Sequence, residues 1–292
     1  MTEKKNYFTL FLCYALWGFQ PLYWSMTGHI NSYVILGCRI VMAAVFSVGI
    51  LAVTKRLKEL AAVFRNKNLM KLLLPAIIFL FLDWAVFIVA VNSGHVLDAS
   101  LGYYINPLVL FGFGIVLYKE KCSAVQWLSL AVAAVGVIIS TVAFGSFPFI
   151  SLVIAINWAV YAAIKKNVNI DGVLSIAVET IIMTPFAIAF LAIFKHSDVA
   201  AFSTTDVLLM LGSGVVTALP MFLYSSCVSK FPLILMCFAQ YLSPTFNLVC
   251  GLIMGESFSK SQIVSLIFFV TAIVIFTANE IVQIKKNSQR SL

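Results

Sequence analysis

Ten stretches of about 20 mostly apolar residues follow one another along this chain. A helix of that length crosses the roughly 30 Å hydrocarbon core of a bilayer. The stretches cover residues 7–25, 33–54, 72–91, 97–118, 124–142, 147–164, 173–194, 206–228, 231–254 and 261–283. Strands of a membrane barrel would alternate in polarity over about ten residues, whereas these runs are longer and uniformly apolar. The sequence therefore predicts an all-α integral membrane protein with ten transmembrane helices.

The composition excludes the other broad classes of protein. Hydrophobic residues make up 62% of the chain and charged residues only 10%, whereas a soluble domain carries about 25% charged residues. A disordered chain would have a much lower content of apolar residues than this one. Ten helices would use about 200 residues, so we expect short loops and no separate soluble domain.

The basic residues are distributed unevenly among the loops between the predicted helices. If successive loops lie on alternate sides of the membrane, sixteen Lys and Arg residues, the predicted loop residue Lys165 among them, share the side of the N-terminus. Only Lys195 and Lys260 fall on the other side, and Arg39 lies inside a predicted helix. Cytoplasmic loops carry such an excess of positive charge. We therefore expect both termini to be cytoplasmic in a cytoplasmic (inner) membrane, and the net charge of +8 indicates topology rather than nucleic-acid binding.

Two segments of the chain recur at nearly constant spacing. Tyr104–Pro107 (Tyr-Ile-Asn-Pro) has a counterpart 137 residues later in Tyr241–Pro244 (Tyr-Leu-Ser-Pro). Glu120–Leu130 shares five residues with Glu256–Leu266, at an offset of 136. The chain is therefore interpreted as two five-helix halves, residues 1–142 and 145–287, followed by a cytoplasmic tail at 288–292.

An odd number of helices in each half forces the second half to run in the opposite sense. The predicted halves are thus inverted repeats, related by an axis in the membrane plane. Secondary transporters commonly have this architecture, with the substrate near the midplane between the repeats.

Specific motifs add a family resemblance that covers nearly the whole chain. The pattern Asp-Trp-x-x-Phe-Ile-x-Ala-Val-Asn-x-Gly-His-x-Leu-Asp-x-Ser-Leu-Gly-Tyr-Tyr-Ile-Asn-Pro runs from Asp83 to Pro107. It resembles the RarD branch of the EamA-type permeases in the drug/metabolite transporter superfamily. Leu16–Trp24, Arg39, Glu179 and Gln240–Pro244 also fit this resemblance.

The resemblance implies a small-molecule permease, not an enzyme, whose natural substrate the family does not specify. Two residues depart from the family pattern, in which Asn usually stands at the position of Asp83 and Glu at that of Asp98. The Asp98 change keeps a carboxylate in a loop. The Asp83 change places an additional ionisable group in the middle of a membrane helix, which could alter charge preference or coupling.

Arg39, Asp83 and Glu179 are the charged residues predicted to lie deep in membrane helices. A charge at the bilayer centre costs about 3 kcal/mol on insertion scales, so such a residue usually faces a cavity or a partner. Asp83 is interpreted as a cation or proton site, or as a carboxylate that pairs with Arg39 to fix helix packing. Arg39 and Glu179 are equally consistent with ion coupling and with structural charge pairs.

Trp17 and Trp158 occupy matching positions in a weaker repeat, Ala15–Trp17 against Ile156–Trp158. Two aromatic faces across the symmetry axis could sandwich an apolar or cationic substrate. The alternative is ordinary packing or a place in the aromatic belt at the membrane surface.

Prolines mark polar segments in the fourth and ninth predicted helices. Pro107 and Pro244 each remove a backbone donor and free a carbonyl one turn earlier. Such kinks are tolerated in lipid mainly where they line a cavity, although a kink that serves packing alone is the alternative. The residues assigned to the substrate cavity are Trp17, Asp83, Trp84, Tyr103, Tyr104, Asn106, Trp158, Gln240, Tyr241 and Ser243. We expect the first, third, fourth, sixth, eighth and ninth helices to bound this cavity, and the fifth and tenth to be peripheral.

No catalytic or cofactor motif occurs in the sequence, and the histidines fall in or beside separate loops. We therefore expect no catalytic residue, no cofactor and no metal site, and we interpret the six cysteines as packing residues. The expected partners are a small-molecule substrate, membrane lipids and protons as a coupling ion.

The leading hypothesis is a permease that exports a small amphiphilic metabolite or drug by alternating access. A carrier of amino acids or related metabolites, acting as an importer or exchanger, is the first alternative. A receptor or scaffold without transport is the second.

Overall fold

A computed structural model describes residues 2–93, 95–145, 147–193, 202–255 and 259–290. Twelve helices and no strands occur in these ranges. The helices are α1 (Thr2–Ser25), α2 (Ser32–Val53), α3 (Leu57–Arg65), α4 (Lys67–Asn92), α5 (Val96–Val116), α6 (Ala124–Phe144), α7 (Phe149–Lys166), α8 (Gly172–Ile193), α9 (Thr204–Val228), α10 (Leu233–Gln240), α11 (Leu242–Ile253) and α12 (Lys260–Arg290). Lys195, and Glu256 of the second repeat motif, lie outside the described residues.

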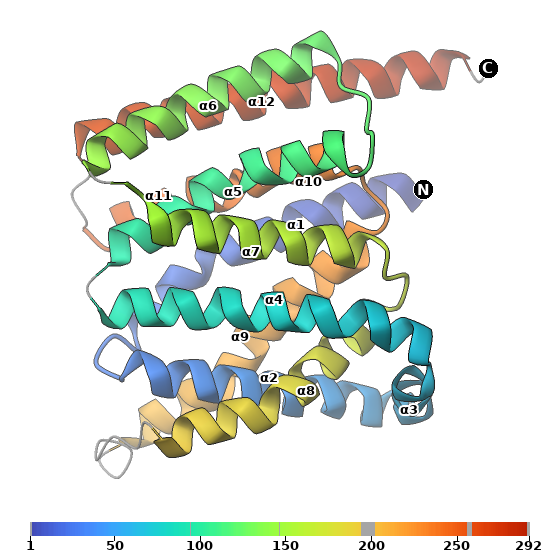
Figure 1. Cartoon of the computed structure of the whole chain (residues 1–292), viewed down its shortest axis with the longest axis vertical. Coiled ribbons are helices and arrows are strands. Elements are labelled where there is room, and N and C mark those ends of the chain that lie inside the picture. The colour runs from blue at the N-terminus through green and yellow to red at the C-terminus, as the bar shows by residue number, and fades with distance from the viewer. Residues whose placement is uncertain (1, 94, 146, 194–201, 256–258, 291–292) are drawn as a thin grey trace.

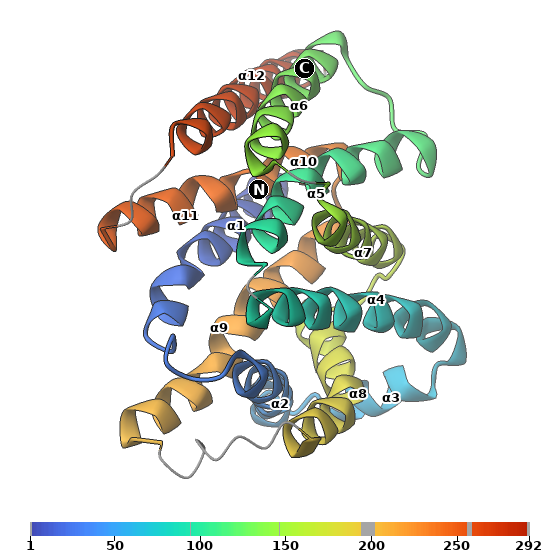
Figure 2. The ribbon, with the colours of Figure 1, turned by 60° about the vertical axis from the view of Figure 1, so that its left-hand side comes forward.

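The long helices run back and forth across one bundle, and each predicted apolar stretch lies on a helix (Figure 1). The stretch predicted at 231–254 is divided into α10 and α11 by a break at Tyr241. The N-terminal end of α1, the C-terminal end of α12 and the short α3 all lie at one end of the bundle, at the right of Figure 1. We call this end the terminal end. α6 and α12 lie side by side at one edge in both views (Figures 1 and 2).

Eight stretches of the described residues are long and apolar enough to cross a membrane, with α10 and α11 counted together. α5 adds a shorter apolar stretch, Ser100–Val116, and α1 lies outside this set. The protein is therefore an all-α, multi-pass membrane protein.

The repeated Ser-x-x-Gln motif begins the two peripheral helices. Before α6, the Ser123 hydroxyl accepts a hydrogen bond from the Gln126 amide at 3.2 Å, and the Gln126 side chain accepts one from the Ser123 amide at 2.8 Å. Ser259 and Gln262 make the same reciprocal pair before α12, at 3.3 and 2.8 Å. A capping box of this kind satisfies two amide groups that a helix start otherwise leaves without partners. The motif that reveals the repeat therefore has a structural role in both halves.

Small residues bring the helices into close contact. A methyl group added to Gly214 of α9 would overlap the backbone of Met42 in α2, and one added to Gly172 would overlap the Phe222 carbonyl. Lipid tails are as apolar as the side chains, so membrane helices associate through such close packing rather than by excluding water. α2, α8 and α9 are thereby packed together.

Candidate functional site

Arg39 of α2 and Asp83 of α4 both lie within the bundle and interact electrostatically with Tyr103 of α5. Asp83 is 1% exposed, and its Oδ1 has no hydrogen-bond partner. The Nε of Arg39 also lacks a partner. The Arg39 guanidinium lies over the rings of Trp84, at 4.5 Å from the centroid, and Trp24, at 5.4 Å. The direct Arg39–Asp83 ion pair that the packing alternative requires is not among the ion pairs of the described residues.

An aromatic cluster joins α1, α7 and α9. The Trp17 and Trp158 rings pack edge to face with centroids 5.4 Å apart, so they contact each other and no substrate is sandwiched between them in this conformation. Tyr224 lies 5.4 Å from the Trp17 ring and 5.3 Å from the Trp158 ring. The Nε1 of Trp158 and the hydroxyl of Tyr224 are buried without hydrogen-bond partners. Two polar atoms without hydrogen-bond partners therefore lie among these aromatic rings.

The two proline motifs meet at α12. The rings of Tyr104 and Tyr241 both stack on Phe269, at centroid distances of 4.9 and 5.0 Å. α5 continues unbroken through Pro107, whereas the break at Tyr241 lies three residues before Pro244 of α11. Both prolines lack a backbone donor, and Pro244 therefore cannot donate to the carbonyl of Gln240. The Gln240 side-chain oxygen is also buried without a partner.

Asn106 and Ser243, equivalent residues of the proline motifs, make equivalent hydrogen bonds. The Asn106 amide donates to the Ala155 carbonyl of α7 at 2.6 Å, and the Ser243 hydroxyl donates to the Tyr14 carbonyl of α1 at 2.9 Å. Tyr14 and Ala155 are 141 residues apart, the same spacing that separates Trp17 from Trp158. The Oδ1 of Asn106 has no partner.

Glu179 lies in a closed ionic network near the terminal end. Its carboxylate accepts hydrogen bonds from Lys165 at 2.5 Å, Ser175 at 2.9 Å and Tyr161 at 2.9 Å. The Lys165 and Glu179 side chains are 1% and 0% exposed. The sequence predicts Lys165 to be a loop residue on the cytoplasmic side; this prediction is wrong, because Lys165 lies in α7 and its side chain is buried in the bundle. Of the two interpretations of Glu179, the fully satisfied carboxylate favours the structural pair.

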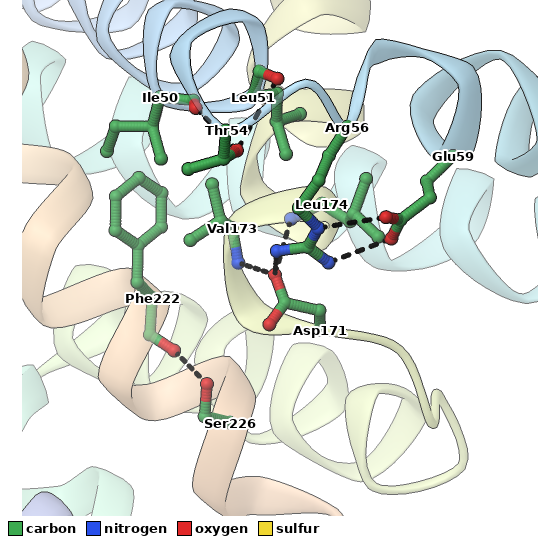
Figure 3. Close-up of polar contacts among 10 residues, drawn as sticks. All are labelled: Ile50, Leu51, Thr54, Arg56, Glu59, Asp171, Val173, Leu174, Phe222 and Ser226. Atoms are coloured by element: carbon green, nitrogen blue, oxygen red, sulfur yellow. Dashed lines mark hydrogen bonds and ion pairs between the residues drawn. The ribbon is translucent and has the colours of Figure 1, made fainter.

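A second cluster of charged residues lies at the terminal end of the bundle, between α3 and α8 (Figure 3). Arg56 lies between two carboxylates, with N–O distances of 2.9 Å to Glu59 and 3.3 Å to Asp171. Asp171 also accepts hydrogen bonds from the Val173 and Leu174 amides at the start of α8. We call Arg56, Glu59 and Asp171 the clasp. The hydrogen bonds from Arg56 lower the pKa of the Glu59 carboxyl, and the same contact raises the pKa of Arg56.

Glu120, the first residue of the repeated segment Glu120–Leu130, binds the N-terminal end of α10. Its carboxylate accepts hydrogen bonds from the Leu233 and Ile234 amides at 2.8 and 3.0 Å, and Lys166 lies 3.4 Å away. A carboxylate at a helix N-terminus satisfies free amides and complements the helix dipole. These residues border a surface hollow of about 410 Å³ at the terminal end, away from Arg39 and Asp83.

Comparison with known proteins identifies the family. The model of the EamA-like transporter family matches residues 4–142. The chain is 34% identical to the uncharacterized transporter YojE of Bacillus subtilis, over 95% of each chain. It is 29% identical to protein RarD of Salmonella typhi, over 92% of each chain, and 27% identical to protein RarD of Escherichia coli, over 94% and 95%. The chain is a RarD-type member of the EamA-like transporter family. This places it in the drug/metabolite transporter superfamily and confirms the resemblance drawn from its motifs.

A solved crystal structure of a protein has the same fold as this transporter. It matches with a TM-score of 0.71 and 14% sequence identity, over 93% of this chain and 96% of the other.

Two polar residues of α9, Thr217 and Tyr224, were not predicted as site residues from the sequence of this EamA-type chain. Their hydroxyl oxygens are buried without hydrogen-bond partners. Thr217 and Tyr224 are seven residues apart, so they lie on one face of the helix. That spacing within an apolar stretch was the available signal, but neither residue is charged or part of the repeat.

The core of this RarD-type protein contains polar groups that are available to bind a solute. Buried polar atoms are nearly always hydrogen-bonded in proteins, and in lipid an unsatisfied group costs several kcal/mol. Unsatisfied atoms come from α2, α4, α5, α7, α9, α10 and α12, and they offer both donors and acceptors. Among the described residues, no group of three His, Cys, Asp or Glu side chains could hold a metal ion.

Proposed function

We propose that this protein is a secondary transporter that moves a small amphiphilic solute across the bacterial cytoplasmic membrane by alternating access, in the direction of export. The solute binds the polar core between two inverted halves, residues 1–142 and 145–287. The single observation that carries the proposal is the set of buried polar atoms without hydrogen-bond partners on α2, α4, α5, α7, α9 and α10 of a membrane transporter; two further such atoms lie on α12. An ordinary packed membrane bundle has no reason to retain them.

Support for the inverted halves comes from paired interactions. The bonds of Asn106 to α7 and of Ser243 to α1 relate equivalent residues of the two halves. The capping boxes before α6 and α12 form a second equivalent pair. Ten crossings would also leave both termini on one side, in agreement with their common end in Figure 1.

Flux measurement tests the proposed transport. The purified protein is reconstituted into liposomes loaded with a pool of isotopically labelled small solutes, and the release of each solute is followed over time. Saturable release that needs the protein supports the proposal, with protein-free liposomes and liposomes that contain an unrelated membrane protein as controls. The absence of protein-dependent release for every solute in the pool would contradict it.

Labelling tests the proposed topology of ten spans with cytoplasmic termini. A cysteine replacing Lys58 in α3 should react with a membrane-impermeant thiol reagent only after the cells are permeabilised. A cysteine replacing Ala200 should react in intact cells. The reverse pattern would contradict both the span count and the inverted halves.

Proton coupling through Asp83 is part of the proposal. A carboxylate in the membrane can carry a proton between the two sides, as ionisable residues do in many transporters. A pH gradient across the liposome should then accelerate flux in the native protein and leave the Asp83→Asn variant unaffected. Equal acceleration of both would assign coupling to another group or to the solute itself.

The carrier of amino acids or related metabolites remains the second candidate. It is favoured by the presence of both a basic and an acidic side chain, Arg39 and Asp83, in the unsatisfied set.

A further inference from the structure

We infer that the terminal end of the bundle binds the phosphodiester headgroup of an anionic phospholipid. The site is the surface hollow bordered by Glu120 and Lys166, together with a second hollow that adjoins it. It lies away from the polar core, so the inference does not depend on transport of a solute. On the topology proposed above, the lipid belongs to the cytoplasmic leaflet.

Two adjoining hollows provide space for a headgroup. The first, of about 410 Å³, is bordered by the α5–α6 and α9–α10 loops and by α6, α7, α10 and α12. The second, of about 340 Å³, shares Lys121, Gln126 and Glu280 with the first and extends along α12 to Gln283. Ligand sites commonly have volumes of about 300–1,000 Å³. The first hollow is therefore large enough to hold a small headgroup.

Three lysines border the first hollow, and two of them are available to an anion. Lys166 is engaged, because its Nζ donates a hydrogen bond to the Phe231 carbonyl at 2.6 Å and lies 3.4 Å from Glu120. Lys121 and Lys230 are exposed and belong to none of the ion pairs in the described part of the chain. A lysine ammonium group carries three donors and a full positive charge, and it is a common ligand of phosphate.

The two carboxylates at the first hollow already have partners. Glu120 binds the start of α10 and Lys166, and Glu280 accepts a hydrogen bond from the Gln126 side chain at 3.0 Å. Three lysines and two glutamates leave a net charge of +1, which balances the single negative charge of a phosphodiester. A zwitterionic headgroup would bring a further positive charge beside the lysines, and like charges that meet at an interface disfavour the wrong partner.

A buried donor without a partner lies at the second hollow. Asn279 of α12 borders this hollow, and its Nδ2 is buried without a hydrogen-bond partner. Buried polar atoms are nearly always hydrogen-bonded, so this amide indicates a place for an acceptor. Phosphate and glycerol oxygens are acceptors of this kind. The donor is a second feature of the site, independent of the positive charge of the lysines.

The hollows lie at the level where the hydrocarbon core meets the headgroups. The apolar span of α6 begins at Ala124 and that of α12 ends at Gln283; Gln126 and Glu280 are each within one turn of these points. The two helices lie side by side at one edge of the bundle and expose apolar side chains along their length (Figures 1 and 2). Trp127, which is 50% exposed, is of a type enriched at this level of the membrane.

This placement favours a lipid over a soluble phosphate compound. With its phosphate in the first hollow, a lipid can extend its acyl chains along the apolar surfaces of α6 and α12, which a soluble compound would leave unused. Basic pockets between membrane helices on the cytoplasmic side bind anionic headgroups in other proteins.

Native mass spectrometry of the purified full-length protein in detergent tests the inference. The protein is titrated with dioleoyl phosphatidylglycerol and, separately, with dioleoyl phosphatidylcholine, which has the same acyl chains and no net charge. Each available lysine should contribute about fivefold in affinity, so we expect one phosphatidylglycerol to bind at least about tenfold more tightly than phosphatidylcholine. Equal affinities for the two lipids would overturn the inference.

Variants locate the site. Lys121→Gln combined with Lys230→Gln should weaken phosphatidylglycerol about 25-fold, and Asn279→Leu should weaken it about fivefold. The matched control combines Lys58→Gln in α3 with Lys71→Gln in α4, which removes the same charge from exposed lysines outside the hollows. It should leave the affinity within about twofold. An equal loss in both double variants would assign binding to general surface charge and overturn the inference. If Asn279→Leu fails to fold, the two double variants still decide, because their substituted lysines are all exposed.

Competition distinguishes the two sources of a phosphate group. Inorganic phosphate and glycerol 3-phosphate are added, one at a time, at the same concentration as the lipid. We expect neither to displace phosphatidylglycerol, because neither contacts the apolar surfaces of α6 and α12. Displacement by either would assign the hollow to a soluble phosphate compound and overturn the lipid assignment.

Failure of this inference is distinguishable from failure of the transport proposal. Lipid binding with the expected ranking but without solute flux in liposomes would contradict transport alone. Solute flux together with equal binding of the two lipids would contradict the headgroup site alone.

Discussion

Removing either charge of the Lys165–Glu179 pair should destabilise the protein far more than removing both. The two side chains are 1% and 0% exposed, and the charged atoms are 2.5 Å apart. At an effective dielectric constant of about 20 their attraction is roughly 6–7 kcal/mol, which is similar to the cost of taking two ions out of water. The pair is thus close to neutral overall, whereas a single remaining charge has lost its compensation. Glu179→Gln or Lys165→Met should each lower the free energy of unfolding by about 3–5 kcal/mol.

The assay is unfolding of the purified protein in detergent by titration with SDS, followed by tryptophan fluorescence. The double variant should recover most of the stability lost in either single variant, because no unpaired charge remains. Glu59→Gln, which removes an exposed charge, is the matched control and should change little. Single losses below about 1 kcal/mol, or a double variant as unstable as the two losses added together, would refute the reasoning. If a single variant cannot be purified, the stability of the double variant remains measurable.

Three further predictions concern the elements that hold the bundle together. Glu120→Gln should cost about 1–2 kcal/mol in the same unfolding assay, because α10 loses the anion at its N-terminus; no change would mean that water replaces the carboxylate. Gly214→Ala should cost about 1–3 kcal/mol through overlap with α2, whereas Gly49→Ala, which meets open space in α2, should be neutral or stabilising by up to about 1 kcal/mol. The lowered pKa of Glu59 means that its contribution to stability is complete above the ordinary value of about 4.3 and is lost as the pH falls through the lowered value; Glu59→Gln should therefore remove this loss of stability in acid and lower the stability at pH 6–8 only slightly, because the ion pair is exposed.

The helices were predictable because the membrane imposes one simple requirement. A segment that crosses lipid must satisfy its backbone internally, so an apolar run of about 20 residues is read directly as a helix. Kinks were predicted at both Pro107 and Pro244, but the structure divides the helix only at Tyr241, before Pro244. The short α3 was missed, because its polar residues were interpreted only as a basic loop.

The site was only partly predictable, because partners come from distant parts of the chain. The deep charges Arg39 and Asp83 were identifiable as unusual in lipid, but their separation depends on how α2 and α4 are placed. Lys165 was misassigned because a lysine near the end of an apolar stretch ordinarily reaches the membrane surface. The folded bundle places it beside Glu179 of α8, and the two side chains meet in the interior. The repeat motifs identified Asn106 and Ser243 as equivalent positions in the sequence. Their equivalent hydrogen bonds, to α7 and to α1, became evident only in the structure.

The most direct test of the central claim compares solute flux through matched variants in liposomes. The account holds that the unsatisfied polar core is the solute site, so Asp83→Asn and Gln240→Ala should each reduce the flux of a transported solute about five- to hundredfold. Thr271→Ala, a polar-to-apolar change at an exposed position of α12, a helix at the edge of the bundle, should leave flux within about twofold. All three proteins should reconstitute to the same level. Normal flux in both core variants together with lost flux in Thr271→Ala would contradict this assignment of the site.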